Sequence, residues 1–264
     1  MLTIKLQGGL GNQLFQLAFL LYISKISGIP YFIQKLESPL TVHSREQYFE
    51  SIFRNFRDKL NSSSVKRILV ENSELAFEDW KTKVNSEDTE FIGYFQRHEY
   101  TDLIRQEFIE TLSFNSSILN KYPDITRKVF IHVRGGDFRK IQDHNVDLTQ
   151  YYKKCLDLSH GEEFVIFTND IPYAKNLLPG IQIIEESEID SLFLMSKCKG
   201  CICANSTFSW WGAYLNPHRP IYLPSIWINR RMDTSGLYFK GVTKIEITQN
   251  YNTKKTVGKL FRRY

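Results

Sequence analysis

Apolar positions follow two different patterns along the chain. Short apolar runs, of the length expected for buried strands, are separated by longer segments in which apolar residues recur every three to four positions. This alternation is typical of parallel α/β units. It predicts strands over residues 2–6, 30–33, 91–95, 128–133, 163–168, 182–184, 200–204 and 220–223. It predicts helices over residues 12–27, 99–112, 149–159, 171–178, 189–198 and 206–216.

The pattern breaks between residues 120 and 127. There the segment Lys121-Tyr122-Pro123-Asp124 interrupts the helical pattern just before the strongly apolar run at 128–133. The chain is therefore predicted to be an α/β protein of two Rossmann-like halves, residues 1–125 and 126–264.

Composition limits the remaining possibilities. With 264 residues, 42% of them apolar, the chain can bury a full core. Its most apolar stretch, 14–23, is interrupted by Gln16 and falls short of the roughly 18 residues that a membrane span needs. The N-terminal segment also lacks the basic leader of a signal peptide. We therefore expect a cytosolic protein.

Three of the four cysteines crowd into one short segment, at Cys198, Cys201 and Cys203. Metal binding is one interpretation of this spacing. The absence of a second cysteine or histidine pair nearby favours the other, in which small cysteines fill the core of a buried strand.

The formal charge of +5 is unevenly distributed, and the last eleven residues contain five cations: Lys254, Lys255, Lys259, Arg262 and Arg263. Such a tail could contact an anionic membrane surface, or it could be a solvated terminus. Nucleic-acid binding is not expected, because no recognisable nucleic-acid-binding motif accompanies the charge.

The first candidate site follows the strand at 2–6, in the sequence Gly8-Gly9-Leu10-Gly11-Asn12-Gln13. Glycines at a strand-to-helix turn allow backbone N–H groups to approach an anion, and the helix N-terminus adds partial positive charge. A phosphate or sugar could bind there. The alternative is an ordinary tight turn, because the full dinucleotide-binding motif is not present.

The second candidate site is His132-Val133-Arg134-Gly135-Gly136-Asp137, directly after the apolar run Val129-Phe130-Ile131. Ligands of open parallel sheets bind at the carboxyl ends of the strands. Arginine suits a diphosphate because its planar guanidinium donates two parallel hydrogen bonds. The alternative is a turn held by an ion pair between Arg134 and Asp137.

Two further polar segments follow later strands. One is Phe167-Thr168-Asn169-Asp170, and the other is Asn205-Ser206-Thr207-Phe208-Ser209-Trp210-Trp211-Gly212. In the second, hydroxyl groups lie at a predicted helix N-terminus, where side chain and backbone can together hold phosphate oxygens. Trp210 and Trp211 are predicted to be core residues or a sugar platform.

Together these segments resemble the family 11 glycosyltransferases, the bacterial and animal α-1,2-fucosyltransferases. The resemblance covers most of the chain. It rests on residues 8–16, the segment Gly93-Tyr94-Phe95-Gln96, and residues 132–137, 168–170 and 190–212. One position departs from the family pattern, which usually has a second arginine where this chain has Gly135.

The resemblance implies a GT-B-like architecture with a cleft, an N-terminal acceptor domain and a C-terminal domain for GDP. Arg134 would then grip the β-phosphate, His132 and Asp190 would contact guanine, and Ser206 with Thr207 would hold the diphosphate. The remaining expected substrate-binding residues are Gly9, Gly11, Asn12, Gln13, Asp170 and Asn205.

The implied reaction is inverting transfer of L-fucose from GDP-β-L-fucose to a galactoside hydroxyl of a glycan, free or lipid-linked. Arg134 would stabilise the leaving group, and Asp137 is the motif carboxylate nearest to act as general base. No metal is expected, since the sequence contains no Asp-x-Asp pair. A different linkage, such as α-1,6 or α-1,3, and a non-catalytic sugar-binding protein remain alternatives.

Overall fold

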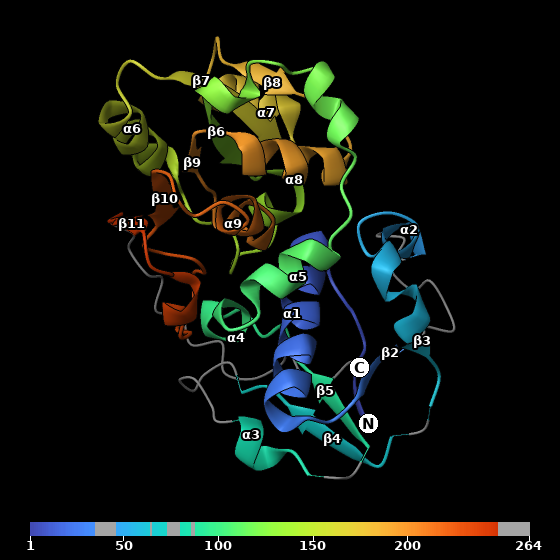
Figure 1. The fold of residues 1–264 in the computed structure, drawn as a ribbon. Coiled ribbons are helices and arrows are strands. Elements are labelled where there is room, and N and C mark those ends of the chain that lie inside the picture. Colours follow the sequence, from blue (N-terminus) through green and yellow to red (C-terminus); the bar gives the residue numbers. More distant parts are fainter. Residues whose placement is uncertain (35–45, 64, 73–79, 86–87, 248–264) are drawn as a thin grey trace.

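The computed structural model describes residues 1–34, 46–63, 65–72, 80–85 and 88–247. They form two parallel sheets, one in each half of the chain, flanked by helices (Figure 1). The N-terminal sheet has the order β3-β2-β1-β5-β4. Its strands are β1 (Leu2–Ile4), β2 (Tyr31–Gln34), β3 (Leu60–Asn61), β4 (Arg67–Val70) and β5 (Thr89–Ile92).

Helix α1 (Leu10–Ser27) is the central helix of the molecule. Every residue from Leu10 to Ile23 except Asn12 is buried, because the helix is packed between the N-terminal sheet and other helices. The helix ends at Gly28, whose φ of +71° places it in the left-handed region that favours glycine.

The C-terminal sheet has the order β11-β10-β9-β6-β7-β8. Its strands are β6 (Lys128–Val133), β7 (Glu163–Thr168), β8 (Gln182–Ile184), β9 (Gly200–Ile202), β10 (Ile221–Pro224) and β11 (Val242–Ile245). Val129, Ile131 and Val133 of β6 pack on the side of α6 (Thr149–Leu158) and α7 (Ile171–Leu177). Phe130 belongs instead to the core on the side of α8 (Glu188–Lys197) and α9 (Thr207–Tyr214). The alternation follows from the two-residue period of a strand.

All strands of the C-terminal sheet are parallel, but the order in which the chain adds them reverses between the two central strands, β6 and β9. The chain continues from β6 through α6 to β7 on one side, and from β9 through α9 to β10 on the other. The connections that follow β6 and β9 therefore run to opposite sides of the sheet and leave a crevice between the carboxyl ends of the two strands. Open α/β sheets bind ligands at such a point, where the strand order reverses (the switch point).

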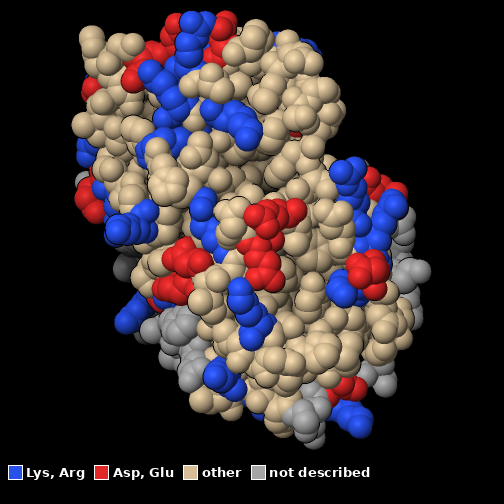
Figure 2. Space-filling model, viewed as in Figure 1, with Lys and Arg blue, Asp and Glu red and all other residues tan. Residues whose placement is uncertain are grey.

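The two halves share one hydrophobic core, which runs across the contact between α1 and α9. The ring of Phe15 lies 4.5 Å from that of Trp210 and 5.1 Å from that of Trp211. Both tryptophans are fully buried, so they are core residues and not an exposed sugar platform. Figure 2 shows a notch between the halves, and acidic and basic side chains are interspersed on the face in view.

All eight predicted strands are present, but β3, β4 and β11 were not predicted. These three lie at sheet edges, where alternation is weak: β3 has two residues, and β11 buries only Ile245. The helix predicted over 99–112 is two helices, α4 (His98–Asp102) and α5 (Arg105–Thr111). The remaining described elements are α2 (Glu46–Phe49), α3 (Trp80–Lys83) and short 3-10 helices at Arg54–Lys59, Ser116–Asn120, Ile125–Arg127, Gly136–Arg139 and Ser235–Leu237.

The predicted boundary lies between the last strand of the first sheet, β5, and the first strand of the second, β6. That residues 1–125 bind the acceptor and residues 126–264 bind GDP stays a prediction. The basic tail with Lys254 to Arg263 lies outside the described residues.

Candidate active site

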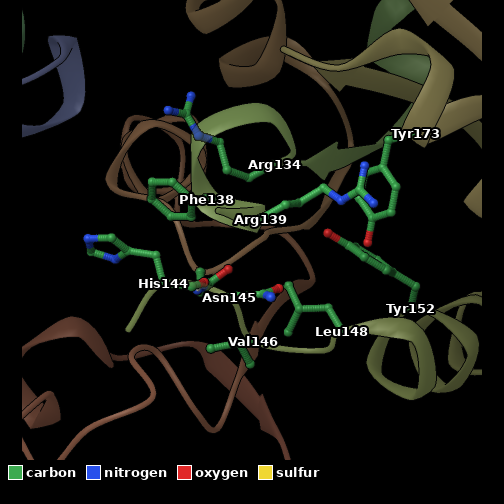
Figure 3. Close-up of a pocket in the computed structure, with 10 residues that line it drawn as sticks. Arg134, Phe138, Arg139, His144, Asn145, Val146, Leu148, Tyr152 and Tyr173 are labelled. Atoms are coloured by element: carbon green, nitrogen blue, oxygen red, sulfur yellow. The ribbon is translucent and has the colours of Figure 1, made fainter. Parts of the chain in front are cut away.

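The crevice at the carboxyl ends of β6 and β9 contains a recess open to solvent (Figure 3). Arg134 lines it from the end of β6 and Asn205 from the end of β9. The other lining residues are Phe138, Arg139, His144, Asn145, Val146, Leu148, Tyr152 and Tyr173.

Arg134 is only partly neutralised by the protein. One of its terminal nitrogens donates to Asp137 at 2.8 Å (Oδ1) and 3.2 Å (Oδ2), and the guanidinium lies 4.7 Å from the centre of the Phe138 ring. Its Nε–H is buried and has no hydrogen-bond partner among the described residues. A buried donor without a partner is costly, and an anionic ligand would satisfy it.

Two residues after β7 hold the glycine loop that follows Arg134. The Gly135 N–H donates to Asn169 Oδ1 and the Gly136 N–H to Asp170 Oδ2, both at 2.9 Å. A β-carbon at Gly135 would overlap Cβ of Asp170 and lie 2.6 Å from its Oδ2. This close approach explains why residue 135 is glycine here, where the family pattern usually has arginine.

Asp170 is therefore a bracing residue in this structure. Besides the Gly136 N–H, it accepts a bond of 3.2 Å from the Tyr173 N–H and so caps α7. The Gly136 N–H is the largest of the influences that lower the pKa of its carboxyl group. The role of Asp170 as a ligand-binding residue stays a prediction.

His132 lies at the end of β6, with 2% of its surface exposed. Burial, together with the charge of Arg134, lowers the pKa of its imidazole to about 3, so the ring is neutral near pH 7. Its Nδ1 is buried and has no partner among the described residues, and its ring centre lies 5.6 Å from that of Phe208. A neutral imidazole can donate from one nitrogen and accept at the other.

The polar residues after β9 have separate positions. Asn205 donates from Nδ2 to the carbonyls of His144 (3.1 Å) and Trp227 (3.0 Å) and thus joins three segments beneath the recess. Ser206 is the N-cap of α9, but its hydroxyl caps no backbone N–H. The Thr207 hydroxyl donates across the seam between the halves to Asn12 Oδ1 at 2.9 Å.

The N-terminal glycine turn contacts α9 directly. A β-carbon at Gly11 would lie 2.5 Å from the backbone carbon of Thr207, so glycine is required by packing. Asn12 Oδ1 accepts from Thr207 and also from Gln96 Nε2 at 3.1 Å. Gln13 is fully buried and donates to the Gly8 carbonyl at 2.8 Å. This turn is a contact between the two halves. Of its three glycines, only Gly9 has open space where a β-carbon would be.

Asp190 lies in the first turn of α8, at the carboxyl end of β8. Its carboxylate accepts from Ser187 Oγ at 2.7 Å, and its N–H donates back to that oxygen at 3.1 Å, which is a reciprocal helix cap. Two acidic neighbours are bonded elsewhere: Glu186 accepts from Lys121 and Tyr122, and Glu188 accepts from Tyr48.

Several residues of the recess were not predicted. Arg139, two residues after Asp137, lies 4.4 Å from the centre of the Tyr173 ring and 3.8 Å from Asp170. Figure 3 shows its side chain leaving the loop in a different direction from that of Arg134. Its charge and position beside the motif are signals that the sequence contained. Tyr152 and Tyr173 come from two different helices, and no local signal marks them.

In the part of the chain that the structure describes, no three histidine, cysteine or acidic side chains are grouped to hold an ion. The four cysteines are unpaired and buried, and burial raises the pKa of the Cys198 and Cys201 thiols to about 12. No described helix combines the length and apolar character of a bilayer span.

The two parallel sheets, one in each half of the chain, form a GT-B-like fold. The family model described as "Glycosyl transferase family 11" matches residues 1–234, and the chain belongs to this family.

Three relatives of known name are similar to the chain. The O-antigen biosynthesis glycosyltransferase WbnK of Escherichia coli is 32% identical over 149 residues, 47% of this chain and 49% of that protein. An α-1,2-colitosyltransferase of Escherichia coli is 26% identical over 80% of this chain and 86% of its own. The galactoside α-(1,2)-fucosyltransferase 2 of Sus scrofa is 27% identical, over 84% of this chain and 72% of that protein.

Among solved structures, NodZ α-1,6-fucosyltransferase soaked with GDP-fucose superposes with a TM-score of 0.52 at 13% identity. The superposition covers 82% of this chain and 92% of NodZ. At this identity the likeness concerns the fold alone.

Proposed function

We propose that this enzyme transfers L-fucose from GDP-β-L-fucose to a hydroxyl of a galactoside, with inversion and in α-1,2 linkage. The observation that carries the proposal is Arg134, at the switch point of the C-terminal sheet with a buried, unpaired Nε–H. The α-1,2 linkage in the names of two relatives supports it. WbnK, named for O-antigen biosynthesis, supports a role in surface polysaccharide synthesis.

The diphosphate would bind between the ends of β6 and β9. Arg134 would donate a forked pair to the β-phosphate, and the uncapped N-terminus of α9 at Ser206 would supply a hydroxyl and backbone N–H groups. Thr207 could donate to phosphate only after leaving Asn12, because a hydroxyl has one hydrogen. Its predicted role therefore requires a rotation on donor binding.

Guanine would be recognised by Asp190, with His132 as the second predicted contact. A carboxylate accepts from the N1 and N2 donors of guanine, an arrangement that adenine and uracil do not offer. Of the three acidic residues at this end of α8, Glu186 and Glu188 are bonded to residues before β6, whereas Asp190 is bonded to the adjacent Ser187. Asp190 is thus the best placed of the three to exchange its partner for a base.

Breaking the bond between GDP and the anomeric carbon of fucose would depend on how well the protein stabilises the negative charge of the leaving diphosphate. As the bond to GDP breaks, negative charge grows on the β-phosphate, and a fixed guanidinium stabilises that charge most in the transition state. Asp137 stays our candidate for the general base, although its carboxylate pairs with Arg134 in this structure. We further propose that the reaction needs no metal.

The experiment is incubation of the protein with labelled GDP-fucose and a panel of β-galactosides, followed by NMR analysis of the linkage formed. GDP release with a fucosyl-α-1,2-galactoside product is expected. Transfer from a GDP-linked colitose but not from GDP-fucose would change the donor, and an α-1,6 or α-1,3 product would change the linkage. Binding of GDP-fucose without any transfer would favour a non-catalytic protein.

The guanine contact has its own test, in which Asp190→Ala is compared with Glu186→Gln. Asp190→Ala should weaken GDP binding and narrow the preference for GDP over UDP and ADP. Glu186→Gln should leave that preference unchanged. The reverse result would move the guanine contact to Glu186.

A further inference from the structure

Phe138 belongs to the loop that follows Arg134. The loop turns back at Gly136, whose φ of +59° lies in the left-handed region that favours glycine, and the Phe138 N–H donates to the Gly135 carbonyl at 3.2 Å. The ring of Phe138 contacts the side chain four residues earlier, because the guanidinium carbon of Arg134 lies 4.7 Å from the ring centre. This distance is within the roughly 6 Å over which a cation and an aromatic ring attract each other.

A third group packs on the same ring. The imidazole of His144 stacks on Phe138, with ring centres 4.7 Å apart and an angle of 20° between the two planes. Figure 3 shows the Phe138 ring between the side chains of Arg134 and His144. Guanidinium, phenyl ring and imidazole therefore form one stack, and all three side chains line the recess.

The imidazole end of the stack is anchored to the rest of the C-terminal half. The His144 carbonyl accepts from Asn205 Nδ2 at 3.1 Å, at the end of β9. The carbonyl of the preceding residue, Asp143, accepts from the Asn229 N–H at 2.6 Å. Burial lowers the pKa of the imidazole below its usual value of 6.5, so the ring is largely uncharged near pH 7 and adds no second cation to the stack. The phenyl ring is thus held from behind by a neutral group whose backbone is fixed.

The other contact of the Arg134 guanidinium is weak. It is the pair with Asp137, whose carboxylate is exposed, and an ion pair that is so well solvated restrains a side chain little. The Nε–H has no hydrogen-bond partner among the described residues. A guanidinium that packs on the face of a ring keeps its in-plane N–H groups free to donate. The stack can therefore fix the direction of the cation and leave its donors to a ligand.

We propose that Phe138 is a positioning residue for Arg134: backed by His144, its ring fixes the guanidinium in the direction from which it donates to the β-phosphate of the GDP-linked donor. The inference rests on the proposed function, because it explains how the cation of that reaction is held in place. A cation that is already oriented stabilises developing negative charge without a cost of reorganisation. Phe138 acts through Arg134 in this assignment, and removal of the guanidinium should remove the effect of the ring.

The test is a double-mutant cycle on GDP binding, measured by titration calorimetry. Phe138→Leu should weaken GDP binding about tenfold, which corresponds to ~1.4 kcal/mol, because the cation loses a ring face. Phe138→Tyr keeps the ring and should bind GDP within about threefold of the wild type. In the Arg134→Ala background, Phe138→Leu should change GDP binding by less than about twofold.

Two further variants complete the comparison. His144→Ala removes the support behind the ring and should weaken GDP binding about threefold, again only when Arg134 is present. The matched control is Phe164→Leu, the same substitution at a partly buried ring near the amino end of β7, away from the carboxyl ends that form the recess. It should lower the melting temperature and leave GDP binding unchanged.

Equal losses of GDP binding from Phe138→Leu with and without Arg134 would overturn the inference, because the ring would then only support the loop. Transfer kinetics separate the inference from the proposed function. Phe138→Leu should lower kcat/KM for GDP-fucose and leave KM for the galactoside unchanged. A cycle that is not additive, in a protein that binds GDP but transfers no fucose, would refute the reaction and retain the positioning role. A wild-type protein that binds no GDP would overturn both.

Discussion

The turn after β1 and the turn after β6 both place glycines at the carboxyl end of a central parallel strand, yet they have different surroundings. After β1, Gly11 contacts the first turn of α9, and Asn12 is bonded to Thr207 and Gln96. After β6, Gly135 and Gly136 are held from behind by Asn169 and Asp170, and the side chain of Arg134 reaches the recess.

The unpaired buried atoms of the two turns also differ in kind. In the first turn the unpaired atom is the acceptor Gln13 Oε1, which cannot bind a phosphate oxygen. In the second it is the Nε–H of Arg134, a cationic donor. In the first turn, glycine thus allows α1 and α9 to pack closely. In the second, it allows the backbone to approach the Asp170 carboxylate. Of these two side-chain atoms, only the Arg134 Nε–H can donate to an anion. Anion binding by the backbone N–H groups of the first turn stays a prediction.

The largest expected effect comes from removing Arg134. Charge-assisted hydrogen bonds contribute roughly 1.5–3 kcal/mol, so Arg134→Lys, which keeps the charge but not the fork, should lower kcat/KM about ten- to a hundredfold. Arg134→Ala should be worse. The pair with Asp137, whose side chain is 56% exposed, should contribute at most about 1 kcal/mol to stability. Melting temperature and kcat/KM are measured together, and a destabilised Arg134→Ala with near-normal turnover would make the second turn merely structural.

A smaller effect, on stability, is expected at Gly11. The methyl group of Gly11→Ala would overlap the backbone of α9 and should lower the free energy of unfolding by roughly 1–3 kcal/mol. Gly9→Ala is the matched control, because nothing lies within 4 Å of its β-carbon and φ is −72°, and it should not destabilise the protein and could stabilise it by up to about 1 kcal/mol. Urea unfolding measures both. A fully stable Gly11→Ala without GDP binding would show that the first turn is a ligand site after all.

His132 should make the second turn sensitive to acid. Its folded-state pKa of about 3 lies below the unfolded value of 6.5, so its contribution is present above pH 6.5 and is lost as the pH falls towards 3. Between pH 7.5 and pH 5 the wild type should lose about 2 kcal/mol more than His132→Asn. Urea unfolding at both pH values provides the comparison, and equal losses would mean that the imidazole is protonated in the folded protein.

The smallest expected effect is that of EDTA. If Arg134 and the α9 N-terminus alone neutralise the diphosphate, excess chelator should leave the rate of fucose transfer essentially unchanged. If EDTA abolished the transfer rate and magnesium or manganese restored it, the reaction would need a metal ion at the second turn.

Local sequence was sufficient for the central part of the fold. The strands predicted over 128–133, 163–168 and 182–184 have the same bounds as β6, β7 and β8, because each is a short apolar run bounded by polar or turn residues. The positions of Arg134 after β6 and of Ser206 after β9 followed from the same kind of run. The edge strand β4 leaves Ile68 and Val70 exposed, and its short apolar run was not predicted as a strand.

Tertiary structure alone decided what each motif does. The sequence Gly8-Gly9-Leu10-Gly11 by itself predicts an anion-binding turn, and only the contact of Asn12 with Thr207, 195 residues away, shows that this turn also connects the two halves. In the sequence, Gly135 is only the loss of the arginine that the family usually has at this position. The structure adds that Asp170 leaves no room there for a side chain. Periodicity determines which residues are buried, since it depends on neighbours along the chain. The use of a polar residue depends on which distant group satisfies its hydrogen bonds, and that is known only once the halves have packed together.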